Sequence, residues 1–204
     1  MRNCILILNL FISVIVFSQT LDMNVDFNQV NTNFINEKLI EKIKEQRKLF
    51  ATSEIIQDIV PMASAKYHTD YYKKYGDTST IHKDGNHIMV DYKGRKIFTE
   101  FAEPENRLYS LLPYCITEPY KEDFDIELIT EISFFEVFSE DVSITYEKLI
   151  DKIFDMFTDF NNKKIIILDY NSGERYFGIS SVTKYENNQV GFMLTFVLCT
   201  RNYN

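Results

Sequence analysis

Apolar side chains recur at three- and four-residue steps in three stretches of the chain, a spacing that is typical of amphipathic helices. The first stretch covers Thr32–Phe50, and the second follows Asp58, a capping residue, and stops at Gly76. The third starts near Thr145 and carries an apolar stripe of five residues. They are Leu149, Ile150, Ile153, Phe154 and Phe157. The pattern predicts three helices and places Phe157 in the core.

Stretches rich in β-branched and aromatic residues lie between and after these helices. Ile126–Phe138 has this character, and Ile88–Tyr92 and Lys96–Phe101 flank a short polar turn. Near the end of the chain, Tyr176–Thr183 and Gly191–Thr200 flank a Glu-Asn-Asn turn signal, which predicts a hairpin. Because helices occur before, between and beside antiparallel strands, the order of elements predicts a layered α+β fold.

Residues 1–18 have the pattern of a secretory signal peptide. One early cation, Arg2, precedes a run of Ile, Leu, Val and Phe, and the small Ser18 precedes a polar residue. The alternative is an uncleaved N-terminal anchor, but the apolar run is shorter than the roughly 20 residues that a membrane span needs. We therefore expect a secreted or periplasmic protein that does not span the membrane once the signal is removed.

The composition limits the classes of partner. The chain carries 30 acidic and 22 basic residues, for a net charge of −8. A diffuse negative charge disfavours nucleic acid and anionic lipid surfaces as partners. The 13 Tyr and 17 Phe residues supply a core, and only 6 Gly and 4 Pro argue against a disordered chain. We expect one domain of ordinary size with no nucleic-acid partner.

Two cysteines, Cys115 and Cys199, lie beyond the predicted signal peptide. In an oxidising compartment an isolated pair favours a disulfide. Two buried free thiols are the alternative, because the separation of two residues in sequence does not give their distance in space. The sequence leaves both alternatives open.

Four short motifs follow one another along the chain. They are "IKEQRK" (Ile43–Lys48), "AKYH" (Ala65–His68), "YEKLIDKIFDMFTDFNNKKIIIL", and the pair "YFGISSV" and "GFMLTFVL". In this order they resemble the N-x-x-R and A-x-x-H motifs, the third-helix segment and the closing hairpin of the CAP superfamily, also called SCP-like. Phe157 stands where that family has a tryptophan. The chain is therefore similar to a divergent bacterial member of a family of exported proteins.

The resemblance implies an α-β-α sandwich, in which a small antiparallel sheet is flanked by helices. It assigns residues 19–30 to a polar lead-in and residues 31–204 to a CAP-like domain. The superfamily groups cysteine-rich secretory proteins, venom antigens and plant pathogenesis-related proteins with many exported bacterial proteins, in agreement with the predicted signal peptide.

The resemblance also implies a cleft with two histidines and two acidic residues, which in some members binds a divalent metal. His82 and Glu131 match two of these places, and Asn162 stands at the place of the second histidine. Asp159 is the nearby candidate for the second acid. An amide cannot replace an imidazole as a zinc ligand. We therefore expect His82, Glu131 and Asn162 to line a ligand cleft that could hold a divalent metal only weakly, at His82.

The two histidines of the stretch between Ala65 and His82 receive different interpretations. His68 shares a helical face with Ala65, which favours a packed, hydrogen-bonded residue over a ligand. His82 lies in a polar loop beyond Gly76 and opens the segment His82–His87, where two imidazoles and a carboxylate could bind Zn²⁺ or Cu²⁺ adventitiously. We expect His68 to be structural and His82 to be the remnant of a site.

Three functional classes remain open. The first is a non-catalytic exported binding module whose cleft holds a protein, lipid or envelope ligand. The second is a divergent hydrolase in which His82 and Glu131 carry out acid–base catalysis. The third is an extracellular structural domain with no ligand. We expect binding over catalysis because Asn162 replaces a histidine, and because nucleophile-elbow, phosphate-loop and H-E-x-x-H motifs are absent from the sequence.

Cleavage of the precursor after Ser18 is the first testable expectation. The charged start, the apolar run and the small residue at the boundary are the features that a signal peptidase needs. N-terminal sequencing of the exported protein should begin at Gln19. An intact Met1 in the membrane fraction would show that the segment is an anchor instead.

Overall fold

The computed structural model describes residues 19–50, 52–79, 82, 89–92, 95–98, 103–104, 107–108, 124–139, 141–168 and 174–203. Its helices are η1 (Phe27–Gln29, a 3-10 turn), α2 (Thr32–Leu49), α3 (Ile59–Tyr75), α5 (Tyr146–Phe157) and α6 (Phe160–Ile166). Its strands are β1 (Ile55–Gln57), β2 (Met89–Tyr92), β3 (Arg95–Phe98), β4 (Phe124–Ser139), β5 (Arg175–Glu186) and β6 (Gln189–Tyr203).

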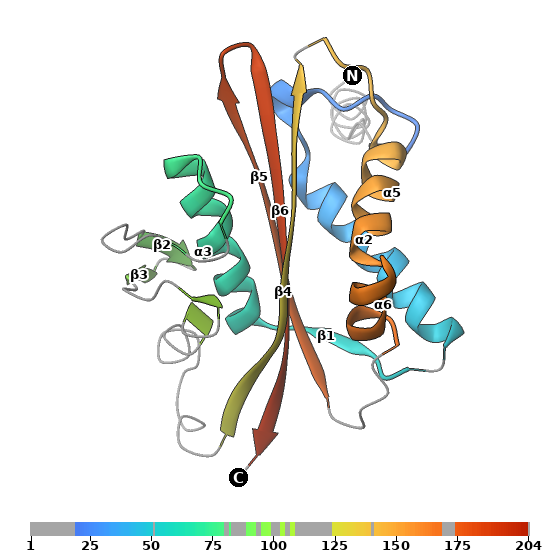
Figure 1. Cartoon of the computed structure of the whole chain (residues 1–204), viewed down its shortest axis with the longest axis vertical. Helices are drawn as coiled ribbons and strands as arrows, with labels where there is room; N and C mark the ends of the chain where they lie inside the picture. The colour runs from blue at the N-terminus through green and yellow to red at the C-terminus, as the bar shows by residue number, and fades with distance from the viewer. Residues whose placement is uncertain are drawn as a thin grey trace, which may run out of the picture.

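A four-stranded sheet separates two helical layers (Figure 1). The strand order is β1-β5-β6-β4, and β1 runs parallel to β5 while the other neighbours are antiparallel. Helices α2, α5 and α6 cover one face, whereas α3 and the β2–β3 hairpin lie on the other (Figure 1). The predicted α+β fold with a sheet between helices is confirmed. The sheet is mixed rather than wholly antiparallel because β1 adds a short parallel strand.

Local signals in the sequence set the helix ends. The side-chain oxygens of Asn31, Asp58 and Thr145 each accept a backbone N–H from the first turn of α2, α3 and α5. Helix α3 ends at Gly76, whose φ of 72° is left-handed and would be strained for a residue with a Cβ. All three predicted helices are confirmed. The bounds of α2 and α3 lie within a residue or two of the expected ones, whereas α5 ends at Phe157 and a separate helix, α6, follows.

Both predicted hairpins are also present. Strands β2 and β3 pair antiparallel, and β5 and β6 pair along the whole length of β5. Asn187 and Asn188 connect β5 to β6 with φ values of 51° and 61°. Two successive residues with positive φ match the right-handed twist of a hairpin, and asparagine tolerates this conformation better than most side chains.

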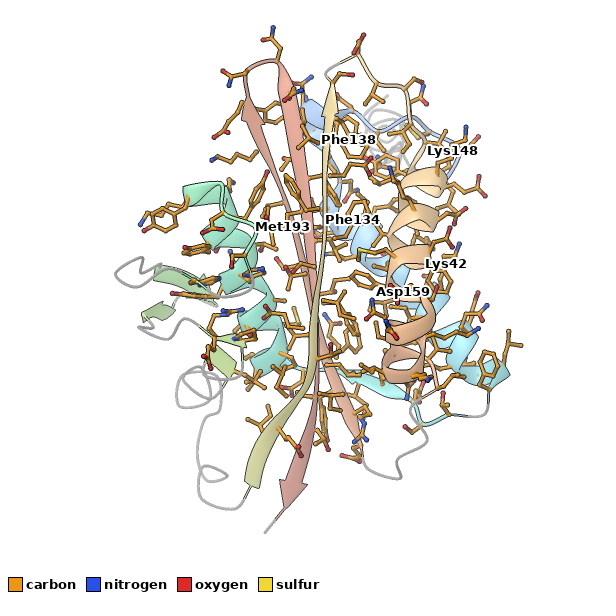
Figure 2. The ribbon with its side chains drawn as sticks, viewed as in Figure 1. Lys42, Phe134, Phe138, Lys148, Asp159 and Met193 are labelled. Atoms are coloured by element: carbon orange, nitrogen blue, oxygen red, sulfur yellow. The ribbon has the colours of Figure 1, made fainter. Side chains whose placement is uncertain are left out.

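Alternation along the strands divides the buried side chains between the two faces. The β6 residues that pack with α2 and α5 are Val190, Phe192, Leu194, Phe196 and Leu198. Val197 and Cys199 instead pack with α3. Figure 2 shows the same division, with Phe134 and Phe138 of β4 on the α5 side and Met193 on the α3 side. The two faces therefore have separate cores.

Helix α3 lies very close to the sheet at Gly178 of β5. A Cβ built at this glycine would lie 2.0 Å from the carbonyl carbon of Pro61, in the first turn of α3. Further along the helix, the hydroxyl oxygens of Thr69 and Ser180 lie 2.9 Å apart and form a hydrogen bond. A residue larger than glycine at position 178 would push the helix away from the sheet.

The buried Arg47, from the motif "IKEQRK", connects three parts of the opposite layer. It is 2% exposed, its Nε donates to the Ser53 carbonyl oxygen at 2.9 Å, and its Nη1 donates to the Ile166 carbonyl oxygen. The rigid guanidinium fork thereby joins the end of α2 to the approach to β1 and to the end of α6.

Part of the segment 19–30 packs on the domain. Val25 and Phe27 are buried, the Val25 N–H donates to the Ile144 carbonyl oxygen at 2.8 Å, and the Phe27 ring stacks on Phe138 with 4.7 Å between ring centroids. This segment contributes apolar contacts to the α5 side of the core.

Truncation of Phe157 tests the predicted core of α5. Its side chain is 0% exposed, and its ring lies 5.9 Å from that of Phe196. Phe157→Ala should lower the free energy of unfolding by about 3–5 kcal/mol, measured by urea denaturation, because it leaves a cavity in a closed core. The control is Leu49→Ala at a position that is 75% exposed, where a change within about 0.5 kcal/mol is expected. Equal denaturation midpoints for the two variants would contradict this view of the core.

Candidate functional site

His82 packs against α3, although it follows Gly76 in a polar stretch of the sequence. Its exposed fraction is 2%. The imidazole stacks on the ring of Tyr71 with centroids 3.7 Å apart and planes 2° apart, and the Tyr67 ring centroid lies 5.4 Å away. Tyr67 and Tyr71 are four residues apart and therefore share one face of α3. They form a flat aromatic surface on which the His82 ring lies.

His68, on the same helix, is bonded directly to His82. His68 Nδ1 and His82 Nε2 lie 2.8 Å apart, and the two rings are 9° from parallel. His68 is 0% exposed, so the prediction of a packed, hydrogen-bonded residue is confirmed. The sequence suggested different roles for the two histidines, whereas the structure joins them in one pair.

The remaining ring nitrogens of this pair, His68 Nε2 and His82 Nδ1, are buried and have no hydrogen-bond partner among the described residues. A neutral imidazole has one N–H and one lone pair. Whichever ring donates in the pair, one N–H and one lone pair therefore have no partner within the described ranges.

Burial keeps both imidazoles neutral. It lowers the pKa of His68 to about 3 and the pKa of His82 to about 2, and the positive charge of Arg107 lowers both pKa values further. At neutral pH neither histidine carries a charge, and neither has a pKa near the value that suits a general acid or base in that range.

Glu131, on β4, forms a buried ion pair with Arg107. Arg107 Nη2 donates to Glu131 Oε1 at 2.6 Å, and the two side chains are 0% and 2% exposed. Burial raises the pKa of Glu131, and the adjacent guanidinium opposes this rise. The second carboxylate oxygen, Oε2, has no hydrogen-bond partner in the part of the chain that the structure describes.

Arg107 connects the histidine pair to Glu131. Its charge acts on both imidazoles, and its guanidinium holds the carboxylate. We call His68, His82, Arg107 and Glu131 the buried polar cluster. The structure thus places His82 and Glu131 on the same side of the sheet, linked through Arg107. Their role as the lining of a ligand cleft stays a prediction.

Asn162 lies elsewhere, on α6. Its Nδ2 donates to the Met156 carbonyl oxygen at 3.2 Å, and its backbone N–H donates to Asp159 Oδ1 at 2.9 Å. Asp159, labelled in Figure 2, is therefore the cap of α6. Because α6 packs on the face of the sheet opposite α3, the structure does not bring Asn162 or Asp159 to His82 and Glu131.

The buried polar cluster does not fit a zinc site in this arrangement. Zinc takes three or four ligands, whereas the facing nitrogens of His68 and His82 bond each other and one Glu131 oxygen accepts from Arg107. Within the described ranges, no group of three or more His, Cys, Asp and Glu residues could hold a metal ion.

The proposed cysteine pair stays a prediction. Cys199 is buried in the α3 core, and its Sγ lies 3.6 Å from the Tyr176 carbonyl oxygen. Cys115 lies outside the described residues, as does most of the segment His82–His87.

Sequence reasoning did not identify Arg107 as part of the site. One signal was available, because Glu131 lies within an apolar strand. A buried carboxylate needs a counter-charge or several hydrogen-bond donors. The sequence could indicate that such a partner exists, but not which of the 22 basic residues supplies it.

No family model matches the chain, and no curated protein matches it in sequence. Among solved structures, it is similar to an outer surface protein from Borrelia burgdorferi, with a TM-score of 0.45 and 12% sequence identity over 86% of this chain and 97% of that chain. A likeness of this size carries no conclusion about function, and the resemblance to the CAP superfamily stays a prediction. None of the described helices is both long and apolar enough to cross a membrane.

The histidine pair predicts a loss of stability in acid. Unfolded histidines have a pKa near 6.5, whereas the folded pair has pKa values of about 3 and about 2. Between these limits the unfolded state binds up to two more protons, so the free energy of unfolding falls as the pH falls, by at most about 2.7 kcal/mol per pH unit. Urea denaturation at a series of pH values between about 7.5 and 4 measures this slope.

The variant His82→Phe keeps an aromatic ring on Tyr71 and removes one titrating group. It should lose about half of the slope below pH 6.5. The matched control is Asn162→Ala on the opposite face of the sheet, which should leave the slope unchanged. If the free energy of unfolding of His82→Phe falls with pH as steeply as that of the wild type, His82 does not stay neutral in the folded protein.

Proposed function

We propose that the chain is an exported binding module and not a catalyst. The signal-peptide pattern of residues 1–18 supports export. One structural observation carries the rest of the proposal: His82 and Glu131, the two groups expected to do acid–base work, have buried side chains, and each is bonded to another buried side chain. His82 bonds His68, and Glu131 bonds Arg107.

In a hydrolase, His82 and Glu131 would have to be accessible to the substrate. A general acid or base must reach the substrate within hydrogen-bond distance and must have a pKa near the working pH. His82 is 2% exposed with a pKa of about 2, and the Glu131 side chain is 2% exposed and paired with a cation. We therefore assign the buried polar cluster a structural role. It would hold the side chains of His82 and Arg107 against α3 and β4.

A structural role agrees with the energetics of buried ion pairs. Removing one partner of such a pair typically costs about 3–5 kcal/mol, because the other charge is left buried and unpaired. The pair itself contributes little net stability, and its value would lie in allowing one arrangement of the chain.

The ligand would then bind on the surface of the domain. A hollow of about 400 Å³ lies between α2 and the edge of β5, and its size is within the range of ligand sites in proteins. Its lining combines apolar and polar side chains. They are Asn33, Asn36, Glu37, Ile40, Glu41, Lys44, Gln57, Met62, Phe177 and Ile179. The acidic charge of the chain favours a protein or other envelope ligand over an anionic lipid surface.

Metal content and turnover test this proposal together. The purified mature chain should contain less than stoichiometric zinc and should hydrolyse a panel of ester, peptide and phosphodiester substrates no faster than buffer does. It should bind saturably to the envelope fraction of the producing cells. Glu131→Gln should leave this binding unchanged in protein that has kept its fold, as should the control Glu127→Gln at an exposed position of the same strand.

Two results would contradict the proposal. One is stoichiometric zinc that is lost in His82→Phe. The other is a hydrolytic rate that is lost in Glu131→Gln but kept in Glu127→Gln, with both variants shown by circular dichroism to be folded at the assay temperature. Either would move the assignment to the hydrolase class.

A further inference from the structure

We propose that the outer edge of β5, beside the hollow next to α2, binds an extended basic peptide of a partner protein as an added strand. This inference rests on the proposed binding function and names its site and class of partner. The edge concerned runs from Phe177 towards Thr183, and it lies apart from the buried polar cluster.

Strand β1 occupies only the first part of this edge. It pairs in parallel with β5 at three positions, from Ile55 opposite Arg175 to Gln57 opposite Phe177. The N–H of Asp58 then donates to the Phe177 carbonyl oxygen at 3.0 Å, and the chain turns away into α3. Strand β5 continues to Glu186, so its outer edge beyond Phe177 has no strand beside it in the described part of the chain.

The free backbone groups on this edge can be identified from the pairing. Backbone groups of successive strand residues point alternately to the two sides of a strand. Since the Phe177 carbonyl points to the β1 side, the N–H and C=O groups of Ile179 and Ser181 also point away from β6. They form no backbone hydrogen bond with other described residues. Such an edge is a template for an incoming strand.

The hollow supplies space for the side chains of that strand. Phe177 and Ile179 form its apolar floor, and Ile40 and Met62 add apolar surface at its sides. Beyond Ile179, the Ser181 hydroxyl donates to Asn36 Oδ1 at 2.9 Å and ties β5 to α2. Main-chain hydrogen bonds along the edge would supply affinity for the incoming strand. The hollow would determine which of its inward-facing side chains are accepted.

The charges on α2 favour a basic partner. Glu37 and Glu41 are exposed and line the hollow, and the whole chain has a net charge of −8. Glu41 also forms an ion pair with Lys38 at 2.7 Å on the same helix, which a basic peptide would have to compete with or share. Lys44 lies at the other end of the lining, over the Phe177 ring with its Nζ 5.7 Å from the ring centroid. A second copy of this acidic chain would bring like charges together, whereas a peptide with lysine or arginine side chains towards α2 would be attracted.

A designed pair of peptides tests both parts of the inference. The probe is the capped hexapeptide Lys-Val-Lys-Val-Lys-Val, titrated into the ¹⁵N-labelled mature chain. The amide signals of Ile179 and Ser181 should shift and gain protection from hydrogen exchange. The peptide Glu-Val-Glu-Val-Glu-Val should bind at least about tenfold more weakly because of its charge, and N-methylation of alternate residues of the basic peptide should abolish binding because it removes the main-chain donors.

Variants of the protein test whether Glu37 and Glu41 attract the basic peptide. The double variant Glu37→Lys with Glu41→Lys should weaken binding of the basic peptide at least about tenfold. The matched control is Glu45→Lys, an exposed position on the same helix that lines a different hollow, and it should bind as the wild type does.

Four results would overturn the inference: no binding of the basic peptide, equal binding of the acidic peptide, unchanged amide signals at Ile179 and Ser181, or occupation of this edge by a second copy of the chain, measured by light scattering. Metal content and turnover do not enter these measurements. Failure at this edge is therefore distinguishable from failure of the proposed non-catalytic function.

Discussion

Both faces of the β5–β6–β4 sheet are covered by helices, and this arrangement constrains the rest of the structure. Neighbouring side chains on a strand point to opposite faces, so each buried one enters either the core beneath α2 and α5 or the core beneath α3. Phe196 and Val197 of β6 illustrate the division, since they are adjacent in sequence and belong to different cores. At Gly178 the constraint is tightest, because α3 approaches the strand so closely that a Cβ would overlap the backbone of Pro61.

The same division collects polar groups on the α3 side. His68, Arg107 and Glu131 are all buried there, and His82 completes the set by stacking on Tyr71. In a low-dielectric interior these groups are tolerated only when they pair with one another. The bonds between His68 and His82 and between Arg107 and Glu131 are the reason why we propose a structural role for this cluster.

The surface offers a different kind of chemistry. Where β1 ends after Gln57, the outer edge of β5 continues without a described strand beside it, next to a hollow lined by α2. Natural proteins usually protect such edges, since free backbone groups attract other chains. An edge flanked by Glu37 and Glu41 is suited to selective pairing with a basic peptide. We therefore propose that the ligand binds at the outer edge of β5 and not at the buried polar cluster.

The sequence by itself determined the local elements. Helical spacing, the cap Asp58 and the stop at Gly76 are short-range signals, so they predicted the helices, and apolar periodicity placed Phe157 in the core. Only the tertiary structure decided which side chains from distant segments contact one another. The bond between His68 and His82, the choice of Arg107 as the partner of Glu131, and the separation of Asn162 from both depend on which face of the sheet each element covers. A one-dimensional pattern contains no information about that choice, because pairing across a sheet is set by packing between segments far apart in the chain.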